Sequence, residues 1–102
     1  MSERKPGDVA NRFLFENERV RVWQMDLAPG ESSDFHEHTL PYVLCILEGE
    51  SIDADLEDGR TLHIPVEGGR VFFVPHGSRE TAVNRSAVRF REQIIEGGKW
   101  RD

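Results

Sequence analysis

Turn-forming residues recur along this chain about every eight to twelve positions, and this spacing limits what it can fold into. Pro29-Gly30, Asp58-Gly59 and Gly68-Gly69 favour tight turns, because proline and glycine supply backbone angles that other residues rarely adopt. The runs between the turns have the length of strands, and no helix of ordinary length is expected. The pattern therefore predicts an all-β chain, folded as an antiparallel sandwich or a small barrel.

Each apolar run between these turns predicts one short strand. Residues 42–47 and 70–75 are nearly continuous apolar runs, whereas residues 51–56 alternate between apolar and polar side chains, which is typical of a half-buried strand. Asp58-Gly59 predicts a hairpin between residues 51–56 and 61–66. The expected strands are residues 13–15, 19–27, 35–38, 42–47, 51–56, 61–66, 70–75, 80–84 and 88–95.

Length, charge and cysteine content narrow the class of protein. The 102 residues predict one domain, with a flexible arm at 1–12, a barrel at 13–96 and a tail at 97–102. A net charge of −6 argues against nucleic-acid binding, which needs clustered basic residues. Cys45 is the only cysteine, which predicts a reducing, cytoplasmic setting. No apolar run approaches the roughly 18 residues of a membrane span, so no membrane partner is expected.

His36 and His38 are separated by one residue in the predicted strand 35–38. Side chains two positions apart on a strand lie on the same face, so the two imidazoles would converge on one point. Neutral histidine is a common ligand of divalent transition metals. The pair therefore indicates a metal or ligand site, although ordinary hydrogen-bonded barrel residues would share the pattern.

The stretch around these histidines resembles the first motif of the cupins. That motif runs from a glycine through His-x-His and a glutamate to a second glycine. Gly30, His36, His38 and Gly49 match it at the required spacings, and Tyr42 stands in place of the glutamate.

A later stretch is similar to the second cupin motif. Gly69, Pro75, Gly77 and Asn84 match it, and Glu80 stands in place of its histidine. The resemblance covers residues 30 to 84 and implies the cupin fold, a double-stranded β-helix or jelly-roll barrel.

The resemblance also implies a metal site with an altered ligand set. Cupins with the common pattern bind a metal through three histidines and one glutamate, and this chain keeps His36 and His38 unchanged. With Glu80 they would form two histidines and one carboxylate, a set associated with non-haem iron. We expect one divalent transition metal, Fe, Mn, Ni or Zn, held by His36, His38 and Glu80. An ion pair of Glu80 with Arg79, Arg89 or Arg91 is the alternative.

Three further residues are candidates for contact with a substrate. Tyr42 is a candidate proton donor to a bound substrate, or a packing residue with a satisfied hydroxyl. Arg91 and Gln93 share one face of the last long strand, and they could bind an anionic or carbonyl-bearing substrate if that face is inward. The outward placement is equally compatible with the sequence.

The resemblance implies a small cupin that acts on a small polar organic molecule, by dioxygenation, isomerisation or decarboxylation. A non-catalytic binding or sensor protein without metal is the alternative, because two of the usual ligands are replaced. Small cupins commonly pair through their barrels, and residues 19–23 offer a surface for this. We therefore expect a homodimer.

Overall fold

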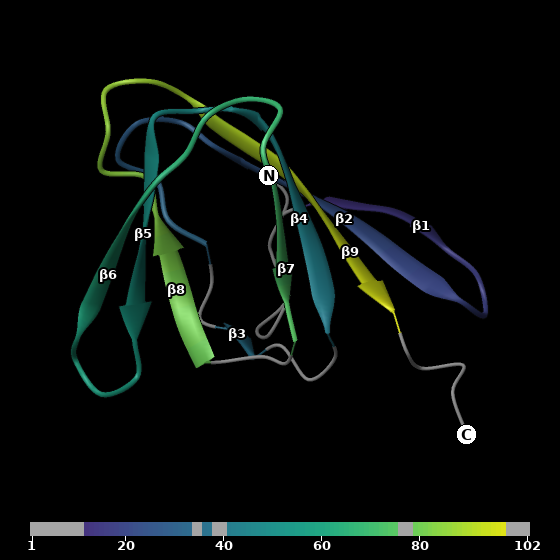
Figure 1. The fold of residues 1–102 in the computed structure, drawn as a ribbon. Coiled ribbons are helices and arrows are strands. Elements are labelled where there is room, and N and C mark those ends of the chain that lie inside the picture. Colours follow the sequence, from purple (N-terminus) through teal and green to yellow (C-terminus); the bar gives the residue numbers. More distant parts are fainter. Residues whose placement is uncertain (1–11, 34–35, 38–40, 76–78, 98–102) are drawn as a thin grey trace, which may run out of the picture.

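The computed structural model describes residues 12–33, 36–37, 41–75 and 79–97, and its regular elements are nine strands (Figure 1). Their bounds are β1 Arg12–Glu16, β2 Val20–Leu27, β3 His36–Glu37, β4 Tyr42–Glu48, β5 Ser51–Leu56, β6 Thr61–Pro65, β7 Val71–Val74, β8 Arg79–Val83 and β9 Phe90–Gly97. Each corresponds to one of the expected strands, so the all-β prediction is confirmed. In this described part of the chain, no helix has the length and apolarity needed to cross a membrane.

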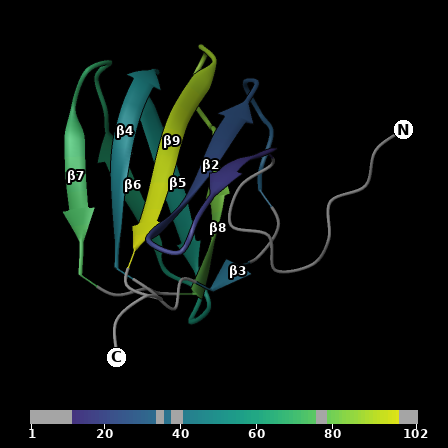
Figure 2. The same cartoon turned by 90° about the vertical axis from the view of Figure 1, so that its right-hand side faces the viewer.

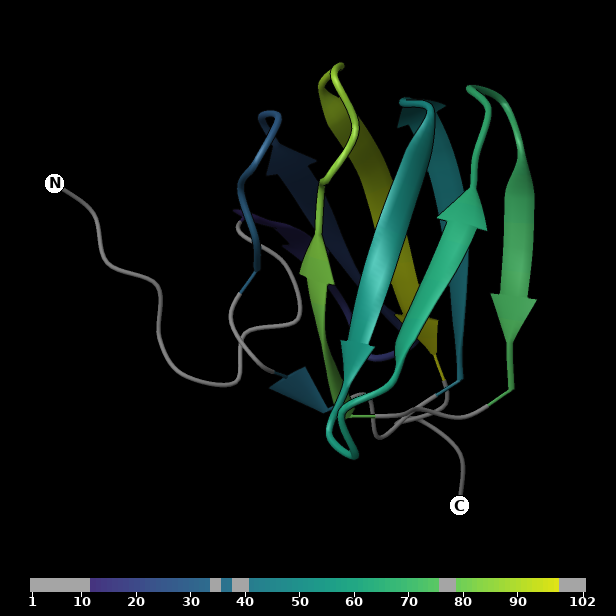
Figure 3. The ribbon, with the colours of Figure 1, turned by 90° about the vertical axis from the view of Figure 1, so that its left-hand side faces the viewer.

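The strands form two antiparallel sheets that face each other. The larger sheet has the order β1-β2-β9-β4-β7 and lies in front in Figure 2. The smaller sheet has the order β3-β8-β5-β6 and lies in front in Figure 3. Most neighbours within a sheet are distant in sequence, as in a jelly roll, whereas β5 and β6 form the hairpin predicted from Asp58-Gly59.

The hydrophobic core lies between the two sheets and is built mainly by β2, β4 and β9. Alternation along each strand sends every second residue inward. The buried cluster consists of Met25, Leu27, Tyr42, Ile46, Ala82, Phe90 and Ile94. On β9 the inward positions also include Glu92 and Glu96, so two carboxyl groups enter an otherwise apolar layer.

The turn after β4 shows why glycine is required at one motif position. Gly49 has φ +146°, which side-chain-bearing residues rarely adopt, and a Cβ there would lie 3.0 Å from Phe90 Cδ1. Gly49 therefore lets the chain turn tightly against the buried Phe90 ring.

Of the predicted arm and tail, only Arg12 and Gly97 are described, and they lie in β1 and β9. The rest of both segments lies outside the described residues, as do His38, Gly77 and His76.

Candidate functional site

A small cavity of about 60 Å³ lies between the sheets, beside the core. A volume of this size accommodates a few water-sized groups. The described residues that line it are Met25, Tyr42, Leu44, Ile52, Asp53, Ala54, Ile64, Glu80, Ala82, Glu92 and Ile94. Its walls are mainly apolar. Among the lining residues with polar side chains, Asp53 is bonded to His63 and Arg85, and the other three are Tyr42, Glu80 and Glu92.

These three side chains come from three different strands. Tyr42 begins β4, Glu80 lies on β8 of the smaller sheet, and Glu92 lies on the central strand β9. The ladders set Glu92 between Met25 on β2 and Ile46 on β4, so its position is fixed from both sides. The sandwich thus brings together the predicted Tyr42 and Glu80 with a second acidic residue, Glu92.

Glu92 is the most perturbed acidic group of this site. The residue is 6% exposed, and burial, with the charge of Glu80 as a lesser cause, raises the pKa of Glu92 to about 8. Removing a carboxylate from water disfavours its charged form, and a second carboxylate nearby adds to the effect. Strong shifts of this kind are common at functional sites.

Tyr42 is also buried, and its hydroxyl stays protonated at neutral pH. Burial raises the pKa of Tyr42 above its ordinary value, and the charges of Glu80, Glu92 and Glu96 raise it further. A neutral phenol is a hydrogen-bond donor and a poor metal ligand. The surroundings of Tyr42 therefore favour the donor role over coordination.

The pairing of β3 with β8 places the backbone of His36 beside the cavity residue Glu80. In the β3–β8 ladder His36 is paired with Glu80, which lines the cavity. Among the described residues, no group of three or more His, Cys, Asp or Glu is arranged to hold a metal ion. The predicted ligand His38 lies outside that part of the chain.

Arg91 and Gln93 do not line the cavity. They alternate on β9 with Phe90, Glu92 and Ile94, which take the inward positions. Arg91 instead forms an ion pair with Glu48 at 3.0 Å. The substrate-binding role expected for Arg91 and Gln93 required the inward face, and the structure gives them the other face.

Sequence reasoning missed Glu92, although one signal was present. Glu92 stands two residues after Phe90 and two before Ile94, so it shares a strand face with both apolar residues. An acidic residue in an apolar face is unusual enough to indicate a site. The reasoning had followed Arg91 and Gln93 on the opposite face.

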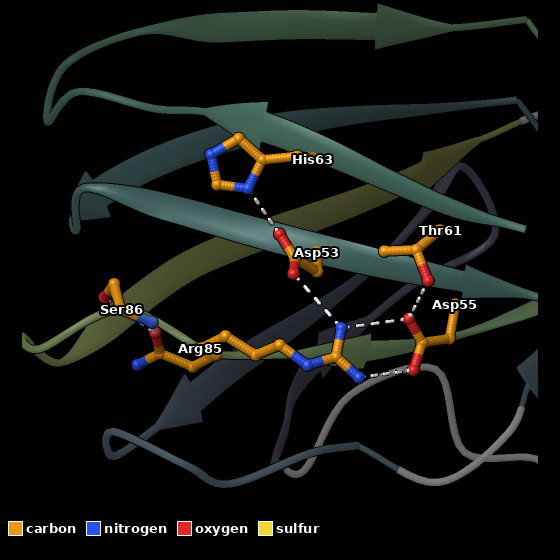
Figure 4. A network of polar contacts seen from close by, with 7 residues as sticks. Asp53, Asp55, Thr61, His63, Arg85 and Ser86 are labelled. Atoms are coloured by element: carbon orange, nitrogen blue, oxygen red, sulfur yellow. Dashed lines mark hydrogen bonds and ion pairs between the residues drawn. The ribbon is translucent and has the colours of Figure 1, made fainter.

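A second polar cluster lies on the outer face of the smaller sheet (Figure 4). His63 Nδ1 lies 2.7 Å from Asp53 Oδ1, and Arg85 bonds both Asp53 and Asp55. Thr61 Oγ1 donates to Asp55. His63 is thus the partner of the Asp53 carboxylate on this outer face.

Comparison with known proteins gives the fold. No protein-family model matches the sequence, and no curated protein is similar to it in sequence. A cupin domain of Bordetella pertussis aligns with a TM-score of 0.78 over 95% of this chain and 99% of its own, at 23% identity. A cupin superfamily protein of Desulfitobacterium hafniense aligns with a TM-score of 0.62 over 94% and 83%, at 20% identity.

An enzyme is also among the similar structures. The polyketide cyclase RemF of Streptomyces resistomycificus aligns with a TM-score of 0.59 over 79% of this chain and 56% of its own, at 24% identity. At these identities the likeness concerns architecture. Together with the two facing antiparallel sheets, it shows that this chain has the double-stranded β-helix fold of the cupins.

Proposed function

We propose that this chain binds one divalent transition metal at the cavity through His36, His38 and Glu80, and acts on a small polar organic molecule. The observation that carries the proposal is the pairing of His36 with Glu80 in the β3–β8 ladder, at a cavity that Glu80 lines. A carboxyl-rich cavity with apolar walls suits a cation, because the ion offsets the cost of burying the acidic groups. Fe, Mn, Ni or Zn would suit histidine with carboxylate.

The chemistry proposed for this cavity depends on its own side chains. A bound metal would polarise an oxygen atom of the substrate. Tyr42, kept protonated by burial and by the surrounding acidic groups, donates a hydrogen bond to that substrate. The apolar walls formed by Leu44, Ile52 and Ile94 limit the access of water. Dioxygenation, isomerisation and decarboxylation are the reaction types that fit.

Metal analysis tests this proposal directly. Protein purified without a histidine tag should contain bound metal, and His36→Ala and Glu80→Ala should each lose most of it. His63→Ala is the matched control, because His63 pairs with Asp53 on the outer face and should leave the metal content unchanged. Equal and negligible metal in the natural protein and in both site variants would contradict the proposal.

A second candidate function is a binding or sensor protein that works without metal. It is favoured by Tyr42 in the motif position of a glutamate, and by a described cavity wall that contains no three-residue metal-binding group. A thermal-shift panel distinguishes the two, because a ligand that binds only the folded state raises the melting temperature. Stabilisation by metal supports the first function. Stabilisation by small organic acids or alcohols in the presence of chelator supports the second.

A further inference from the structure

Glu92 is a buried carboxyl group that has no hydrogen-bond or ion-pair partner among the described residues. Its side chain lines the cavity, and it forms no hydrogen bond or ion pair within the described part of the chain. Burying a carboxyl group without compensation is costly, so such groups are normally paired or bound to a metal. A group placed this way on a central strand indicates that something other than the described residues satisfies it.

The surroundings of Glu92 point to a cation. Glu80 lines the same cavity, and its charge acts on Glu92. No lysine, arginine or histidine is found among the described residues that line the cavity. A cation between the two carboxylates would remove their mutual repulsion and compensate the burial of Glu92.

Glu96 shows that not every buried acid on β9 has this role. It is also buried and lies four residues further along the same face, but it accepts a hydrogen bond from Trp23 Nε1 at 3.1 Å. Glu96 is not among the residues that line the cavity. The strand thus carries one acid with a structural partner and one directed at the cavity.

We propose that Glu92 is a second carboxylate ligand of the metal, facing Glu80 across the cavity. This inference rests on the proposed metal-binding function. Two carboxylates balance the charge of a divalent ion in an apolar site, and together with imidazole they favour Mn²⁺ or Fe²⁺ over metals that prefer softer ligands. The position of Glu92 on β9 lies outside both sequence motifs described above.

The test compares Glu92→Gln with Glu96→Gln by titration of the metal-free proteins with Mn²⁺, followed by electron paramagnetic resonance. Glutamine keeps the size of the side chain and removes the charge. We expect Glu92→Gln to weaken Mn²⁺ binding by about tenfold or more, a loss seen even for groups that only support metal ligands. Glu96→Gln keeps an oxygen for Trp23 and should bind Mn²⁺ like the natural protein.

Thermal unfolding in chelator provides a second readout that separates a ligand from a structural residue. Without metal, Glu92→Gln should be at least as stable as the natural protein, because the neutral amide avoids the cost of removing a charged carboxylate from water. With Mn²⁺ present, the natural protein should gain more in melting temperature than the variant. A purely structural Glu92 would instead give a variant that is destabilised in chelator.

The experiment distinguishes a wrong role for Glu92 from a wrong metal site. If the natural protein binds Mn²⁺ and Glu92→Gln binds it equally well, the role of Glu92 is wrong while the metal site stands. If the natural protein binds none of Mn²⁺, Fe²⁺, Ni²⁺ or Zn²⁺, both this inference and the proposed function are wrong.

Discussion

Asp53 and Glu92 are both buried acids, yet their surroundings act on them in opposite directions. A hydrogen bond from His63, supported by Arg85, holds the pKa of Asp53 below its ordinary value despite burial. Glu92 has no such partner among the residues that the structure describes, and burial raises its pKa to about 8. The contrast separates a carboxylate with partners in the fold from one that we propose binds a cation.

The pairing of Asp53 predicts how stability depends on pH. The pKa of Asp53 is lower in the folded than in the unfolded chain, so the ionised carboxylate stabilises the folded state. This stabilisation is present above the unfolded pKa and is lost as the pH falls through the folded pKa. Asp53→Asn should destabilise the protein by about 1–3 kcal/mol near pH 6, and the difference should shrink below pH ~4. Urea unfolding of both proteins at several pH values measures this.

A suitable control for Asp53→Asn is Glu57→Gln. Glu57 forms an exposed ion pair with Arg79, and such pairs contribute little to stability. A difference between Asp53→Asn and the natural protein that stays constant down to pH 3 would show that the His63–Asp53–Arg85 contacts do not stabilise the folded state.

Asn84 joins three structural elements through one fully buried amide. The residue is 0% exposed, and its Nδ2 donates to the carbonyl oxygens of Leu27, at the end of β2, and of Val88, before β9. Its Oδ1 accepts from the backbone N–H and the hydroxyl of Ser86. This network explains physically why asparagine stands at the end of the second motif.

Replacing Asn84 should therefore weaken the whole sandwich. Asn84→Ala removes the side-chain donor to the buried Leu27 carbonyl group and one of the two side-chain donors to the Val88 carbonyl group, to which the Ser86 hydroxyl also donates. This should cost about 1–3 kcal/mol of unfolding free energy. Ser86→Ala removes only the hydroxyl contacts and should cost less. Chemical denaturation monitored by tryptophan fluorescence compares the two variants. A loss below about 0.5 kcal/mol for Asn84→Ala, the range of ordinary surface substitutions, would contradict this role.

The strands were predictable because short-range signals define them. Turns such as Asp58-Gly59 and apolar runs such as residues 42–47 depend on neighbours in sequence, and the structure has strands at those places. The face of β9 was harder to assign, since Arg91 and Gln93 alternate with Glu92 and both sides carry polar residues. The structure shows which face of β9 is inward, because Phe90 and Ile94 are part of the buried core.

The candidate site was only partly predictable for the same reason. Tyr42 and Glu80 were located through the motif resemblance, and both line the cavity. The register that pairs His36 with Glu80 joins segments far apart in sequence, and no local pattern specifies it. The isolated position of Glu92 depends on the packing of two sheets, which the sequence shows only as one acid in an apolar face.

The two edges of the larger sheet are β1 and β7, and both expose aromatic residues. Phe15 on β1 is 50% exposed, and Phe73 on β7 is 67% exposed. The β1–β2 hairpin projects away from the smaller sheet (Figure 1), so none of the nine described strands packs opposite β1. Exposed apolar edge strands are prone to pair with another chain.

The sequence of β1 favours pairing with a second copy of itself. In an antiparallel pair centred on Leu14, Arg12 of one copy would lie opposite Glu16 of the other, and Phe13 opposite Phe15. A two-fold contact needs such a self-complementary surface. The expected homodimer would then form through the β1 edge, next to residues 19–23.

Matched substitutions at the two edges test this expectation. Phe15→Glu places a charge in the proposed contact and should give a monomer of 11.7 kDa, whereas Phe73→Glu alters a more exposed aromatic residue on β7 and should leave the dimer intact. Light scattering coupled to size-exclusion chromatography at micromolar concentration measures both. Because Phe15 is exposed, its substitution should leave the monomer folded, which circular dichroism can verify. A natural protein that is monomeric, or a dimer that only Phe73→Glu disrupts, would show that β1 is not the contact.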